Sequence, residues 1–529
     1  MKTQLPCCLA GLTWILAGLA SPDIKAADLT AVVTQQVHPV LVRNDHNALF
    51  RLTIAADSPF VLLRALTVSL QGTDDPHDID SLQLFFAGEK GEFSTKARFG
   101  DAIRPTGETV VLRGHARLQQ GPNHFWLSCR LAAKADLNRW VDATCTALET
   151  SVGHVAPVDE SNGLRKRIGI ALRKHYDDGV HTYRIPALAT TTQGTLLCAY
   201  DMRRRKGRDL QEDIDIGLSR STDGGQTWEP QQVIMDQGTY AGKPQALNGV
   251  SDPGMIVDPS TGEIFCFAVW MVGKEGKHQW DKDGSEPGFE IGKSAQFLMV
   301  RSRDDGRTWT KPQNMTRTWK KKDWFLYVPS PQQGIALKDG TLVMPTQGRD
   351  AQDREFSNLL ISRDHGAHWT VSQPASLDTS ESQAVQLGDG SIMMNMRTET
   401  GQKFRTIAVT RNLGQTWTPH VTSRKNLIEP NCNGSLYRFD LGNDGDYVLL
   451  FANPHSQTGR DHHSIQVSFD DGLHWPQKNR ILLDAFRGAG YPSLSRVDDK
   501  HVGIVYEGSQ SHLVFQKIAI DELLQRDKP

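Results

Sequence analysis

The stretch Ser221-Thr222-Asp223-Gly224-Gly225-Gln226-Thr227-Trp228 is the strongest indication of the fold, because its pattern of Ser, Asp, Gly, Thr and Trp returns along the second half of the chain. Further copies begin at Ser302, Ser362 and Ser468, and a degenerate copy at Thr410 carries Asn in place of Asp. In such an Asp box the Asp accepts hydrogen bonds from nearby backbone N–H groups, Gly supplies a positive φ, and Trp packs beneath the turn. The variable spacing of the copies indicates one supersecondary unit, repeated with insertions.

The Asp boxes predict the blades of a β-propeller. Each copy follows a short apolar run such as Ile214–Leu218 or Leu298–Val300, which is typical of a strand leading into a tight turn. Four-stranded sheets arranged radially form a β-propeller. We therefore predict an all-β chain with a six-bladed β-propeller carrying the Asp-box repeats over residues 168–529.

The region before the boxes predicts a second β domain. Residues 28–150 contain several strand-like runs, separated by turn sequences such as Gly121-Pro122-Asn123. This pattern favours a β-sandwich, either a carbohydrate-binding domain or a brace against the propeller. Residues 151–167, rich in Gly, Ser, Pro and charge, are predicted to be a linker.

Composition and the N-terminus restrict the class of protein. The net charge of the 529 residues is −2, with no basic block beyond Arg203–Arg208, so a nucleic-acid partner is not expected. Lys2, the apolar run Leu9–Ala20 and the small residues that follow are typical of an export signal, predicted over residues 1–27. That run is too short to span a membrane, and nothing later qualifies. We expect an exported protein, periplasmic or secreted, with no integral membrane segment after signal removal.

The cysteines and metal motifs point away from a disulfide scaffold and from a metalloenzyme. Five cysteines follow the signal, a sparse and odd set. Cys129 and Cys145 lie in consecutive strand-like runs and either pair or remain buried thiols. Because no HExxH, CxxC or EF-hand spacing appears, we expect no metal and no other cofactor.

Three arginines lie at strand ends that a propeller does not itself require. Arg184 opens an apolar strand, Arg397 ends the strand Ser391–Met396, and Arg460 lies in the loop Thr458-Gly459-Arg460. On three different blades, they are expected to converge at one end of the central channel. A guanidinium remains charged and binds carboxylate bidentately, so three of them would form an anion clamp.

The motif Tyr183-Arg184-Ile185-Pro186 followed by Asp boxes resembles the bacterial exo-sialidases (neuraminidases) of glycoside hydrolase family 33. The resemblance covers most of residues 165–529, and the first domain resembles the β-sandwich that precedes the catalytic domain in gut-bacterial sialidases. It implies that Arg184, Arg397 and Arg460 grip the carboxylate of sialic acid. Arg203, nineteen residues after Arg184, and Asp209, six residues later, match a substrate-binding arginine and the acid/base aspartate of the family.

The resemblance assigns four further residues. Tyr491 in Gly488-Ala489-Gly490-Tyr491 matches the nucleophile, and Glu381 matches the glutamate that activates it. Glu507 matches the acid that holds the first arginine, and Asp252 the aspartate lining the glycerol or O4 side of the substrate.

These residue types suit the chemistry that the resemblance implies. Sialic acid carries a carboxylate on its anomeric carbon, so a neutral tyrosine avoids the repulsion that a carboxylate nucleophile would meet. A phenol with a pKa near ~10 needs a base, which is Glu381. Asp209 then protonates the leaving oxygen and later activates water. Two displacements imply retention of configuration.

We therefore predict an exo-α-sialidase that hydrolyses terminal sialic acid from glycoproteins, glycolipids such as gangliosides, and sialyl-oligosaccharides through a tyrosyl-enzyme intermediate. The alternatives are a trans-acting enzyme, either a trans-sialidase or an anhydro-forming one, and a non-catalytic sialic-acid-binding propeller. A binding protein would have no use for Tyr491, Glu381 and Asp209 together.

Overall fold

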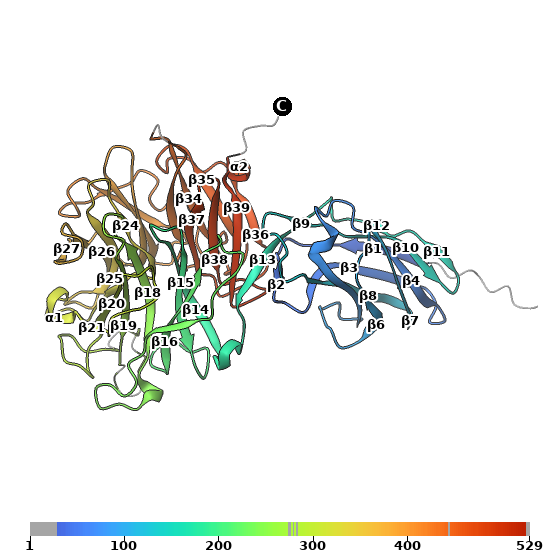
Figure 1. Cartoon of the computed structure of the whole chain (residues 1–529), viewed down its shortest axis with the longest axis horizontal. Helices are drawn as coiled ribbons and strands as arrows, with labels where there is room; N and C mark the ends of the chain where they lie inside the picture. The colour runs from blue at the N-terminus through green and yellow to red at the C-terminus, as the bar shows by residue number, and fades with distance from the viewer. Residues whose placement is uncertain are drawn as a thin grey trace, which may run out of the picture.

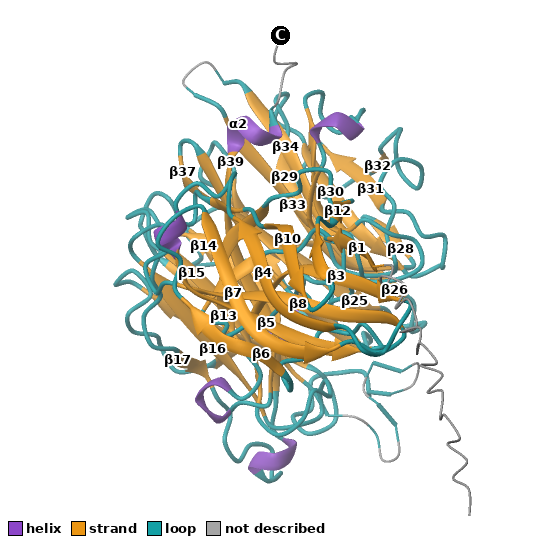
Figure 2. Cartoon of the chain, turned by 90° about the vertical axis from the view of Figure 1, so that its right-hand side faces the viewer, coloured by secondary structure: helices purple, strands orange, loops and turns teal. Residues whose placement is uncertain are grey.

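The computed structural model describes residues 29–524, except 273, 275–276, 279, 282–283 and 443–444. Strands dominate these residues, as predicted, and the two α-helices among them are single turns, α1 (Thr316–Trp319) and α2 (Ile520–Leu523) (Figure 2). No helix in the described part of the chain is long and apolar enough to cross a membrane. The predicted export signal, residues 1–27, lies outside the described residues.

The N-terminal domain is a β-sandwich of a six-stranded and a four-stranded sheet (Figure 1). Burial alternates along β7, because one face of its sheet covers the core and the other meets solvent. The six-stranded sheet is ordered β12 (Val158–Asp159), β1 (Leu29–Thr34), β3 (Asn47–Ala56), β8 (Gly121–Leu131), β5 (Ile79–Gly88) and β6 (Arg98–Ile103). The four-stranded sheet is ordered β11 (Gly153–Val155), β10 (Thr144–Thr150), β4 (Leu62–Ser69) and β7 (Thr109–Arg117).

Two short strands fall within residues 151–167, the predicted linker. β11 pairs with β10, and β12 runs parallel to β1. Sheet pairing of the first domain therefore continues to Asp159, and the connection that follows is short because β13 begins at Lys166.

The second domain contains six sheets, each of which is a blade of the propeller. The first blade consists of β14 (Thr182–Thr190), β15 (Leu196–Arg203), β16 (Ile214–Ser221) and β17 (Gln232–Met235). The second consists of β18 (Val250–Val257), β19 (Ile264–Trp270), β20 (Gln296–Ser302), β21 (Gln313–Asn314) and β23 (Gln332–Gln333). The third consists of β22 (Leu326–Pro329), β24 (Ile335–Ala336), β25 (Leu342–Arg349), β26 (Glu355–Ser362), β27 (Thr370–Val371) and β28 (Ser376–Leu377). The fourth blade consists of β29 (Thr379–Gln386), β30 (Ile392–Thr398), β31 (Thr406–Thr410) and β32 (Thr418–Pro419). The fifth consists of β33 (Ser435–Asp440), β34 (Tyr447–Pro454), β35 (His463–Ser468) and β36 (Ile481–Asp484). The sixth consists of β37 (Pro492–Asp498), β38 (His501–Tyr506), β39 (Leu513–Ala519) and β13 (Lys166–Arg173).

The ring of blades closes on itself. Strands of neighbouring blades contact one another around the ring, for example β14 with β18 and β25 with β29, and β37 of the sixth blade contacts β14 of the first. The sixth blade joins the two ends of the domain, since β13 pairs antiparallel with β39 and places Ile170 opposite Phe515. Strands such as β15 and β16 are buried along their whole length, because neighbouring blades cover both faces of each sheet.

The Asp boxes form the turns that the sequence predicts. The Thr227 backbone N–H donates to Asp223 over 2.9 Å, the Trp228 indole donates to the Gly225 carbonyl over 3.0 Å, and Gly225 has a φ of 89°. The degenerate copy keeps the local bonds of Asn412, but its Trp417 indole donates to the carbonyl of Gln373 instead. These turns follow the third strand of each of the first five blades, at the ends of β16, β20, β26, β31 and β35.

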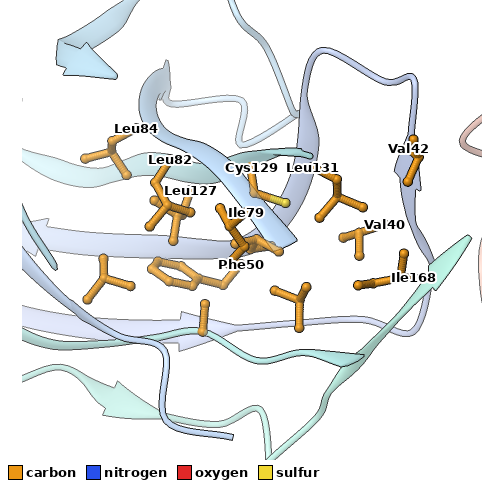
Figure 3. Close-up of a cluster of buried hydrophobic side chains, with 14 of the residues drawn as sticks. Val40, Val42, Phe50, Ile79, Leu82, Leu84, Leu127, Cys129, Leu131 and Ile168 are labelled. Atoms are coloured by element: carbon orange, nitrogen blue, oxygen red, sulfur yellow. The ribbon is translucent and has the colours of Figure 1, made fainter. Parts of the chain in front are cut away.

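The two domains share one hydrophobic core. β2 (Val40–Val42) runs parallel to β13, and β9 (Trp140–Val141) pairs with β13 antiparallel. Figure 3 shows Val40 and Ile168 beside sandwich residues of the same cluster, such as Leu131. Cys129 and Cys145 are both buried free thiols of this cluster, so the disulfide considered from the sequence does not form.

Candidate active site

The innermost strand of each blade begins, and the second strand ends, at the same end of the propeller. Arg184, Asp252 and Glu381 lie in the first residues of β14, β18 and β29. In each of these strands the register against its neighbour slips at this place, which marks a β-bulge. Bulges re-aim side chains, and here they turn alternate residues of the inner strands into the channel mouth.

Two of the bulges hold strained backbone. Ile185 has a φ of 56° and Asp252 a φ of 59°. A β-branched residue such as Ile rarely adopts this left-handed region, and strain of this kind gathers at functional sites. Both residues precede a proline in the sequence. The strain therefore marks the same end of the propeller as the bulges do.

Tyr491 and Glu381 form a hydrogen-bonded pair on the floor of this end. The Tyr491 hydroxyl donates to one oxygen of Glu381, and the Arg397 guanidinium donates to the other oxygen over 2.9 Å. Burial, followed by the charge of Glu381, raises the pKa of Tyr491 well above its ordinary value. The phenol is therefore neutral at rest, and its proton already points at a carboxylate that can accept it.

The three predicted arginines surround the ring of Tyr491. The Arg184 and Arg460 guanidinium carbons lie 5.4 and 5.6 Å from the ring centre. Arg397 donates to the Tyr491 hydroxyl over 3.2 Å and to the Asn431 side chain over 2.8 Å. The convergence of three cations from three blades creates the anion clamp that the sequence predicts.

Glu507 fixes Arg184 and the backbone around it. Its carboxylate accepts from Arg184 Nε over 2.5 Å, from the Ile185 N–H over 2.7 Å and from the Tyr491 N–H over 3.0 Å. Burial acts to raise the pKa of Glu507, but the Arg184 guanidinium and the two N–H groups outweigh it and lower this pKa below its ordinary value. Glu507 thus fixes Arg184 and Tyr491 relative to each other.

Glu507→Gln is expected to destabilise the fold by about 3 kcal/mol at pH 7, because it leaves the Arg184 charge without its buried partner. A lowered pKa in the folded state means that the carboxylate stabilises the fold above the unfolded pKa, near 4.5, and loses this effect as the pH falls through the folded pKa. Thermal unfolding measured between pH 7 and pH 3 should show that the difference in Tm between wild type and Glu507→Gln narrows below about pH 4.5. A difference in Tm that stays constant with pH would contradict this role of Glu507.

A second group of charges surrounds Asp209. Arg203 is 2% exposed, lies 3.0 Å from Asp201 and 3.3 Å from Asp209, and so ties the Asp209 loop to β15. Asp201 also accepts from the Asp252 N–H over 3.0 Å. Burial, with the nearby Asp209 and Asp201, raises the pKa of Asp252 well above its ordinary value, which favours the neutral carboxyl.

The predicted residues enclose one cavity of about 390 Å³. Seven of the nine line it, and Arg203 and Glu507 lie buried behind the lining. The lining predicted residues are Arg184, Asp209, Asp252, Glu381, Arg397, Arg460 and Tyr491. The structure therefore brings all nine together, from strands and loops spread over more than three hundred positions of the chain.

Other residues of the cavity were not predicted. Glu399 lies 3.0 Å from Arg397 Nε, and burial together with Glu399 raises the pKa of Glu355. Glu355 is the first residue of β26, and Glu399 directly follows β30. A polar residue at the cavity end of a strand is the sequence feature that could have identified both. Further unpredicted lining residues are Ile185, Trp280, Leu326, Gln347, Gly348, Arg349 and Ser380.

Three apolar residues in and after β19, Trp270, Met271 and Trp280, differ in whether they reach the cavity. Trp280 lines the cavity. Trp270 is fully buried, with its indole donating to Asn248 over 3.0 Å, and Met271 is also in the core. Only one of the three can therefore touch a ligand.

A propeller whose channel mouth combines an arginine clamp with a tyrosine–glutamate pair defines a glycosidase of the sialidase class. The profile of the BNR repeat-like domain matches residues 194–506, and that of the N-terminal domain of BNR-repeat neuraminidase matches residues 28–153. A sialidase of Bacteroides fragilis is 34% identical over 96% of this chain and 97% of its own length.

Two further similar proteins are also sialidases. A sialidase of Micromonospora viridifaciens is 32% identical over 62% of this chain and 50% of its own. The solved structure of the Hadza microbial sialidase Hz136 superposes with a TM-score of 0.87 at 33% identity, covering 93% of this chain and 99% of that one. The chain belongs to the sialidase (neuraminidase) family, and sialylated glycans are its substrate class.

Proposed function

We propose that the protein is an exported exo-α-sialidase, periplasmic or secreted, that releases terminal sialic acid from glycoproteins, glycolipids and oligosaccharides with retention of configuration. The observation that carries the proposal is the hydrogen bond from the Tyr491 hydroxyl to Glu381 beneath three arginines. A sialic-acid-binding protein would need the arginines but not a buried phenol paired with a base.

The reaction takes two displacements in this proposal. The arginines hold the carboxylate, Glu381 takes the Tyr491 proton, and the phenolate oxygen attacks the anomeric carbon. Asp209, which is 35% exposed at its side chain and tied to Arg203, protonates the leaving oxygen and then activates water for the second displacement. Fixed arginine charges stabilise the anionic site throughout.

The product distinguishes this function from its rivals. Purified protein is mixed with sialyllactose, free sugar is followed by mass, and the first anomer is followed by NMR. Initial release of α-sialic acid supports a retaining hydrolase. A dehydrated or transferred product would identify a trans-acting enzyme, and bound but uncleaved sialyllactose would overturn catalysis.

Asp209→Asn is expected to lower kcat/KM for sialyllactose by about 100-fold, because the leaving sugar oxygen loses its proton donor. The loss should be much smaller for 4-methylumbelliferyl sialoside, whose leaving group departs without a proton. Asp213→Asn, in the same loop, is the matched control and should retain activity. Equal losses on both substrates would remove Asp209 from the acid role.

A further inference from the structure

The loop 174–181 joins β13 to β14 and exposes an aromatic ring in a strained conformation. Tyr176 is 61% exposed and has φ 64° and ψ 10°, in the left-handed region. Glycine or asparagine suits this conformation better than tyrosine does. A strained residue persists where its surroundings impose the conformation, and such positions gather at binding sites.

Both domains hold this loop in place. Arg43 of the sandwich pairs with Asp177 over 2.7 Å, and Arg173 of β13 pairs with Asp178 over 3.2 Å. The Tyr183 hydroxyl donates to the Asp177 carbonyl over 2.7 Å. These contacts already order the loop, and this lowers the entropy cost of fixing it around a ligand.

Histidine rings orient the Tyr176 side chain. Its ring centre lies 4.0 Å from that of His175 and 5.4 Å from that of His181. His175 in turn lies 5.4 Å from His512. Tyr176 and His175 are both exposed, so together they present a rigid aromatic surface to solvent.

This surface borders the catalytic end on the side of the proposed acid. The His181 N–H donates to the Arg204 carbonyl over 3.2 Å, at the start of the loop that carries Asp209. His181 also precedes Arg184 by three residues, which limits the separation of their Cα atoms to about 10 Å. In Figure 1 the loop follows β13 and enters β14 on the propeller side that adjoins the sandwich.

We propose that Tyr176, with His175 beside it, is a stacking platform for the neutral sugars that follow sialic acid in the glycan. The inference rests on the proposed exo-sialidase function. The leaving oxygen must face the acid, so the remaining glycan departs on the Asp209 side, and the hydrogen bond from His181 to Arg204 ties the loop 174–181 to the loop that carries Asp209. Aromatic rings pack against the apolar C–H face of hexoses, and binding of such remote parts of a substrate contributes to turnover.

The test compares two substrates that differ only in the leaving group, sialyllactose and the methyl α-glycoside of sialic acid. Tyr176→Ala is expected to lower kcat/KM for sialyllactose by about 10-fold and to leave the methyl glycoside unchanged. Tyr176→Phe should retain both activities, since stacking needs the ring. Tyr176→Gly relieves the backbone strain and should repeat the Ala result in a fold that is no less stable.

The matched control is Phe469→Ala, which removes an exposed aromatic ring, 49% exposed, from the last Asp box. It should change neither activity. Equal losses of both activities in the Tyr176 variants would indicate a purely structural loop and overturn the platform, as would no loss at all. A wild-type protein that cleaves neither substrate would instead overturn the proposed function, and the platform with it.

Discussion

Tyr491→Phe is expected to lower kcat for sialyllactose by about 1,000-fold or more, the scale on which enzymes lose activity without their nucleophile. Phenylalanine keeps the ring between the Arg184 and Arg460 guanidinium groups, which lie 5.4 and 5.6 Å from its centre. It lacks the oxygen that forms the bond to the sugar. Binding of sialic acid, measured by calorimetry, should therefore stay within a few-fold of wild type while turnover disappears.

Tyr437→Phe is the matched control for this variant. Tyr437 is in β33, outside the catalytic cavity, and its hydroxyl accepts from the Arg496 N–H over 3.2 Å. Its replacement should cost some stability but no turnover. Unchanged kcat in Tyr491→Phe would exclude Tyr491 as the nucleophile, and joint loss of folding and binding would assign it a structural role.

Arg397→Lys is expected to lower kcat/KM for sialyllactose by about 1,000-fold, although it preserves the charge. Arg397 donates to Glu381 over 2.9 Å and to Asn431 over 2.8 Å, and it lines the cavity. A single ammonium group cannot repeat this planar fork. Two lost charge-assisted hydrogen bonds to the substrate carboxylate amount to about 4 kcal/mol together.

The methyl ester of the substrate identifies the lost contact. Wild type should strongly prefer the free acid over the ester, and Arg397→Lys should lose most of that preference. Arg438→Lys, which alters an arginine paired with Asp440 over 2.8 Å in another part of the propeller, is the control and should keep it. An unchanged preference in Arg397→Lys would show that Arg397 does not contact the carboxylate.

The catalytic end was predictable where each residue sits beside a local motif. Arg184 lies in the motif Arg-Ile-Pro, and Arg203 and Asp209 are separated by a short, defined spacing. The Asp boxes predict the blades around these residues. Glu399 belongs to no such motif, so the sequence did not single it out, yet it contacts Arg397 at 3.0 Å. This contact depends on how the chain turns at the end of β30, which no local motif specifies.

The junction of the domains was less predictable. β2 and β9 belong to the sequence of the first domain but pair with β13 of the propeller. Val40–Val42 is an apolar run of three residues, and nothing local tells which sheet such a run joins. The sharing of one core by the two domains follows from this pairing.

The all-β class, the Asp-box turns and the types of residue at the site were all predictable from the order of amino acids. Those features depend on hydrogen bonds and φ angles within about eight residues, which local sequence specifies. Three contacts became evident only in the folded chain: Tyr491 with Glu381, Glu507 with Arg184, and Asp201 with Asp252. These contacts depend on β-bulges and on closure of the ring of blades, where groups far apart in the chain meet because each blade can bury its faces only against its neighbours.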